Sequence, residues 1–147
     1  MSRAYQPVVL EDLPIGAFAA AVTYMADVLR ECQLMLVDRE QGADIDPELG
    51  ALAVALIPDL EELREILRGA TITVDDRCYR VWTEMRSSDA AMMVHLQKQL
   101  VQLRFLARRG GLLVASDPEV LQFLDWVWDE AAAQLQGRTA RPYRRRR

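Results

Sequence analysis

His95 is the one side chain of this 147-residue sequence whose charge changes close to neutral pH. It lies in the stretch Val94-His95-Leu96-Gln97-Lys98, within a segment of helical periodicity. A histidine on such a helix could accept a phosphoryl group in a bacterial signalling protein. The next residue is a leucine, not the acidic residue that usually follows a phosphoaccepting histidine. The sequence therefore favours a structural histidine, with phosphotransfer through His95 as the alternative.

The other residue types that do chemistry form no known constellation. The glycines spell neither G-x-x-x-x-G-K nor G-x-G-x-x-G, so the common nucleotide-binding loops are absent. Met92 stands three positions before His95, where a di-iron helix bundle would need glutamate, and no cysteine-rich cluster suits zinc. Carboxylate pairs at i,i+4 spacing fall on polar helix faces, where they solvate the helix: Asp27/Glu31 and Glu61/Glu65. The sequence predicts a protein that is not an enzyme and holds no metal or cofactor.

Composition sets the class of protein. Hydrophobic residues make up 51% and charged residues 27%, enough for one packed core. No apolar run reaches the roughly 20 residues of a membrane span, and no signal-peptide pattern opens the chain. One lysine against seventeen arginines, with no asparagine, indicates GC-rich codons. We therefore expect a cytoplasmic protein from a high-GC bacterium, in which Cys32 and Cys78 are free thiols.

The net charge of -4 is unevenly distributed. Six of the eighteen basic residues lie in the last ten positions, so the rest of the chain carries 12 basic against 22 acidic residues, or -10. An acidic body is a poor partner for nucleic acid, except through this basic tail. Gly137 and Pro142 should stop the last helix, and clustered arginines repel one another. We expect a folded domain over residues 1–137 and a disordered tail over 138–147.

Four amphipathic helices are expected over residues 14–42, 46–69, 88–110 and 117–136, because apolar residues recur at spacings of three and four. The second and fourth helices start with the same tripeptide, at Asp46-Pro47-Glu48 and Asp117-Pro118-Glu119. It supplies a capping carboxylate, a proline in the first turn and an acidic residue in the first turn. Pro58 should kink or split the second helix.

Residues 71–84 change the pattern, because β-branched and aromatic residues flank the polar turn Asp75-Asp76-Arg77. This favours a short β-hairpin. Residues 1–11 read as an extended arm. The expected fold is mainly all-α, a four-helix bundle with a small β-hairpin between the second and third helices.

Apolar residues also lie on the faces turned away from the predicted bundle core. They are Val94, Val101 and Phe105 on the third helix and Phe123 and Trp126 on the fourth. A helix that is apolar on two sides is either central or at an interface. The hairpin could cover this surface, but an interface is the preferred interpretation, and a two-fold homodimer is its simplest form.

A third possibility is a helical sensor of small molecules. Its pocket would be lined by Met25, Met92, Met93 and Trp128. Methionines at helical spacing are more commonly part of an ordinary core.

The C-terminal third resembles the end of small actinobacterial proteins without assigned function. The similarity rests on Gly111-Leu112-Leu113, Asp117-Pro118-Glu119-Val120, Trp126, Glu130, Gln134-Leu135 and Pro142. It implies no activity and no site residue. The sequence thus predicts a homodimeric interaction or regulatory protein whose protein partner is unknown.

Overall fold

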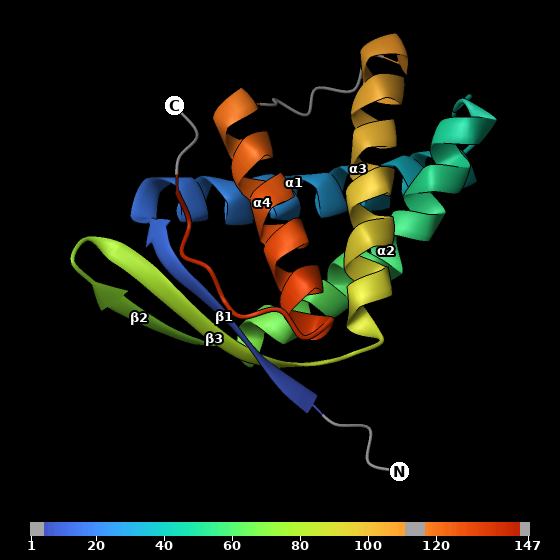
Figure 1. Cartoon of the computed structure of the whole chain (residues 1–147). Coiled ribbons are helices and arrows are strands. Elements are labelled where there is room, and N and C mark those ends of the chain that lie inside the picture. The colour runs from blue at the N-terminus through green and yellow to red at the C-terminus, as the bar shows by residue number, and fades with distance from the viewer. Residues whose placement is uncertain (1–4, 111–116, 145–147) are drawn as a thin grey trace.

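A computed structural model describes residues 5–110 and 117–144. Its elements are β1 (Tyr5–Pro14), α1 (Ile15–Glu40), α2 (Pro47–Arg68), β2 (Thr71–Asp75), β3 (Cys78–Arg86), α3 (Asp89–Gly110) and α4 (Pro118–Leu135). In Figure 1, α3 and α4 stand side by side and cross in front of α1, and the sheet lies at one end of the helices.

The helix starts follow from local chemistry, as the sequence predicts. The Asp46 carboxylate accepts a hydrogen bond from the Glu48 N–H at 2.9 Å, and Asp117 accepts one from Glu119 at the same distance. Each cap precedes a proline in the first turn, where its missing N–H costs nothing. The second helix is not split at Pro58, because α2 continues through it to Arg68.

The predicted hairpin is confirmed by β2 and β3, which pair antiparallel from Thr71↔Trp82 to Asp75↔Cys78. Its two central residues, Asp76 and Arg77, both have positive φ, at 41° and 68°. Two-residue hairpin loops need this geometry, because it matches the right-handed twist of the strands.

The expectation of a mainly all-α four-helix bundle with only a hairpin is wrong. Residues 5–14 form a third strand, β1, which pairs antiparallel with β3 to give the order β1-β3-β2. The alternation of side chains that would signal this strand is interrupted. Its register with β3 shifts between Leu10 and Leu13, where Asp12 has a φ of 58°. Because of this bulge, the side chains of residues 5–14 do not alternate regularly along the strand, and the sequence pattern did not indicate β1.

Helix α4 is buried on more than one side. Its buried residues include Val120, Leu124 and Trp128, and also Phe123 and Ala132 on other faces. The helix contacts α3 and α1 on one side and β1 on another. Its second apolar face therefore belongs to the core, since a helix that is apolar all round is a central one.

Candidate functional site

The segment after α4 returns along β1. Leu135 lies opposite Gln6, whose side chain donates to the Leu135 carbonyl at 3.5 Å, and the Tyr143 N–H donates to the Glu11 carbonyl at 2.9 Å. Figure 1 shows this red segment beside the blue strand β1. The sequence predicts disorder from residue 138 onward, but residues 138–144 are held against the domain, and 145–147 lie outside the described residues.

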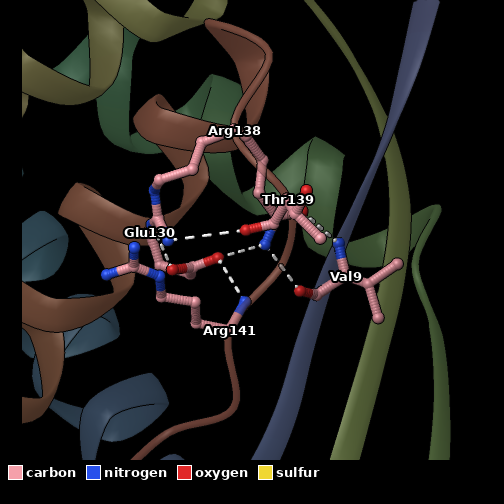
Figure 2. Close-up of polar contacts among 6 residues, drawn as sticks. Val9, Glu130, Arg138, Thr139 and Arg141 are labelled. Atoms are coloured by element: carbon pink, nitrogen blue, oxygen red, sulfur yellow. Dashed lines mark hydrogen bonds and ion pairs between the residues drawn. The ribbon is translucent and has the colours of Figure 1, made fainter.

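Glu130 on α4 anchors this segment. Its side chain is only 2% exposed, and its carboxylate forms an ion pair with the Arg138 guanidinium. It also accepts hydrogen bonds from the Arg141 N–H at 3.1 Å and from the Gln134 side chain at 2.6 Å. Figure 2 shows Arg138 and Arg141 beside the Glu130 carboxylate. A buried carboxylate is tolerated only when it is paired in this way, so the arginine that seemed to favour disorder fixes the segment instead.

Two residues of the predicted dimer interface are covered by this segment. The Tyr143 ring meets Phe123 edge to face, with ring centroids 5.3 Å apart, and meets Trp126 in the same way at 5.0 Å. Phe123 is 2% exposed and Trp126 is half-buried. Phe123 therefore belongs to the core and Trp126 packs within the chain, so neither fits an exposed interface.

The same packing shapes a cleft between α3, α4 and the C-terminal segment, which we call the α3–α4 cleft. It encloses about 330 Å³, within the usual range for small-molecule sites. Asp125, Trp126 and Asp129 of α4 line it, together with Gln97 of α3 and Tyr143 of the C-terminal segment, and Gln122 and Arg144 complete it. The two carboxylates share one face of α4, because residues four apart are neighbours on a helix.

A small recess of about 10 Å³ adjoins this cleft, since Gln97 and Asp125 line both. Tyr24 of α1 and Arg104 of α3 also line the recess. Tyr24 is 6% exposed, and its hydroxyl has no hydrogen-bond partner among the residues that the structure describes. Burial raises the pKa of this hydroxyl, Arg104 lowers it and Asp125 raises it further, so the phenol is neutral at physiological pH.

The remaining predicted interface residues lie on one exposed stripe. Val94, Val101 and Phe105 are 38%, 50% and 64% exposed on the outer face of α3. His95 is exposed beside them and makes no hydrogen bond or ion pair with the described part of the chain. Among the described residues, none is therefore held against His95 to assist phosphotransfer.

The four residues predicted to line a ligand pocket are not brought together. Met25 and Trp128 line a wholly apolar cavity of about 70 Å³ between the sheet and the helices. Met93 is buried and Met92 half-buried on α3, and neither lines that cavity. The methionines at helical spacing therefore pack in or against the core, as methionines usually do.

Of the residues that line the α3–α4 cleft, the sequence analysis singled out Trp126 alone, and as an interface residue. The spacing of Asp125 and Asp129 on either side of Trp126 was an available signal. The sequence held no signal for the position of Tyr143, because this residue belongs to a segment that was expected to be disordered. Within residues 5–110 and 117–144, no group of three or more histidine, cysteine or acidic side chains could hold a metal ion.

No protein-family model matches the sequence, and neither a curated protein nor a solved structure matches the chain. The resemblance of the C-terminal third to small actinobacterial proteins therefore stays a prediction. Of the helices described, none is long and apolar enough to cross a membrane.

Proposed function

We propose that this is a non-enzymatic interaction protein that forms a homodimer through the outer face of α3. The observation that supports it is a row of three exposed apolar side chains, Val94, Val101 and Phe105, with Lys98 at the position between the first two. The spacings of four, three and four are those of a coiled-coil seam. Full burial of a wholly exposed Val or Phe side chain gains roughly 1.5–3 kcal/mol, and these side chains, 38–64% exposed, would gain part of that.

A second copy of the chain is the simplest occupant of this stripe. A self-complementary stripe closes about a two-fold axis, and the exposed stripe of α3 runs from Val94 to Phe105, or nearly two heptads. Lys98 interrupts the seam, and a single polar residue at a seam position is a common device for fixing register and oligomer state. The opposite face of α3, with Met93, Leu96 and Leu100, is already buried inside the chain.

Light scattering after size exclusion tests this proposal, with twice the chain mass as the expected result. Phe105→Glu should give a monomer of unchanged helicity, because it places a charge in a dry seam. Val54→Glu is the matched control, since Val54 is an exposed apolar residue of α2, outside the stripe. A wild-type monomer at tens of micromolar, or a Phe105→Glu dimer, would contradict the proposal.

We further propose a bacterial cytoplasmic location, which the arginine-rich composition and the two free cysteines support.

Sensing of a small molecule is a second candidate function. The specific observation in its favour is the α3–α4 cleft, whose volume suits a ligand.

A further inference from the structure

We propose that the α3–α4 cleft binds a small organic cation, a primary ammonium carried on an apolar or aromatic group. This inference goes beyond the homodimer, because it concerns residues of α4 and the C-terminal segment that the proposed dimer does not use.

The charge of the cleft selects a cation. Asp125 and Asp129 face it without a hydrogen bond or ion pair to any described residue. Asp125 is half-buried, so its field is less screened than that of a fully exposed group. Arg144 is the one basic residue among the described residues that line the cleft, and it is exposed, where water and salt weaken its repulsion.

The walls of the cleft suit the apolar part of the ligand. Trp126 and Tyr143 lie edge to face, with ring centroids 5.0 Å apart, and both line the cleft. Aromatic faces attract cations through their quadrupole, and tryptophan does so best. The same rings offer apolar area to an aromatic or alkyl group.

The inner end of the cleft supplies the acceptors. A primary ammonium has three N–H donors, and Asp125 and the Gln97 amide provide oxygen acceptors at this end. Arg104 lines the recess behind them together with Tyr24, whose hydroxyl is buried, so the ammonium lies on the cleft side of Asp125.

Titration of the full chain with benzylammonium, followed by calorimetry and by amide NMR shifts, tests the proposal. We expect saturable binding that weakens with added salt. Benzyl alcohol and benzoate have nearly the same shape without the positive charge, and both should bind more weakly. Benzyltrimethylammonium keeps the charge but loses the N–H donors, and it should also bind more weakly.

Variants locate the site. Asp125→Asn should weaken benzylammonium binding about tenfold, the usual effect of removing one charged hydrogen-bond partner. Asp38→Asn, an exposed acid on α1, is the matched control and should bind like the wild type. Tyr24→Phe should bind benzylammonium like the wild type, because the Tyr24 hydroxyl is buried behind the cleft.

Four results would overturn the proposal. They are no binding of benzylammonium, equal binding of benzyl alcohol, tighter binding of benzoate, and equal losses in Asp125→Asn and Asp38→Asn. The Phe105→Glu variant should bind benzylammonium like the wild type, so a failure of the homodimer and a failure of the cleft are distinguishable.

Discussion

The side-chain amide of Gln134 pairs with both backbone polar groups of Val9. The Val9 N–H donates to Gln134 Oε1 at 2.9 Å, and Gln134 Nε2 donates to the Val9 carbonyl at 2.8 Å. A neighbouring strand would make the same two contacts. The outer edge of β1 is therefore covered by a helix side chain, which blocks the pairing with other chains that open edges invite.

Replacement of this amide should both destabilise the protein and expose the edge. Gln134→Leu leaves the Val9 groups unpaired and removes a donor from Glu130, so the free energy of unfolding should fall by about 2 kcal/mol. Urea denaturation measures the loss, and light scattering during heating should show earlier aggregation. Gln136→Leu, at an exposed position just after α4, is the control. Equal stability of the two variants would show that the pairing contributes nothing.

Removal of residues 138–147 should destabilise the domain. A chain ending at Gly137 leaves the buried Glu130 carboxylate without Arg138 and uncovers Phe123 and Trp126. The expected loss is about 3 kcal/mol, as for a buried charge deprived of its partner. Thermal unfolding followed by circular dichroism measures it. A chain ending at Arg144 keeps every described contact and serves as the control. An unchanged melting temperature on ending at Gly137 would show that the segment does not stabilise the domain.

The hairpin turn offers a stabilising substitution. Arg77 has a φ of 68°, a region that costs residues with a side chain roughly 1–2 kcal/mol. Arg77→Gly creates the Asp-Gly pair that such turns prefer, and should raise the free energy of unfolding by about 1 kcal/mol. Asp76→Gly should gain less, because aspartate tolerates positive φ better than arginine does. A loss of stability in Arg77→Gly would contradict the turn geometry.

Cys32 should make stability fall at alkaline pH. Burial and, to a smaller extent, the charge of Glu31 raise the pKa of this thiol from its ordinary 9.0 to about 11. The folded state then binds more protons than the unfolded state between these values, so stability is complete below pH 9 and is lost as pH rises toward 11. The loss attributable to this group is about 2–3 kcal/mol. Urea denaturation of Cys32→Ala should show a shallower dependence on pH, whereas Cys78→Ala should keep the wild-type slope.

His95 should not form a stable phosphohistidine. It is exposed, and no described side chain is bonded to it to activate or stabilise an adduct. Intact mass measurement after incubation with acetyl phosphate checks this. An added phosphoryl group that disappears in His95→Ala would establish phosphotransfer as an activity of the chain.

The helices could be predicted from the sequence because their signals are local. The Asp46 and Asp117 caps act on backbone groups two residues away, and the apolar stripe of each helix repeats within its own length. The hairpin was equally accessible, since only two residues separate β2 from β3.

The parts that could not be predicted depend on residues far apart in the chain. β1 pairs with β3 about 70 positions later, and its bulge and Pro7 obscure its alternation. The α3–α4 cleft depends on Glu130, whose pairing with Arg138 reverses the effect expected from a run of arginines. Phe123 and Trp126 looked unpartnered only because the segment that covers them was assumed to be disordered.

The cover on β1 has a consequence for synthesis on the ribosome. β1 leaves the exit tunnel before the other elements of this domain, and Gln134, which pairs with Val9, is translated 125 residues after it. Until then the nascent chain presents a strand edge with no cover. Contacts between residues this distant close slowly, because a long loop must be ordered before they form. The domain therefore completes its fold only after translation has passed Gln134, and newly made chains are most exposed to edge-to-edge association before that point.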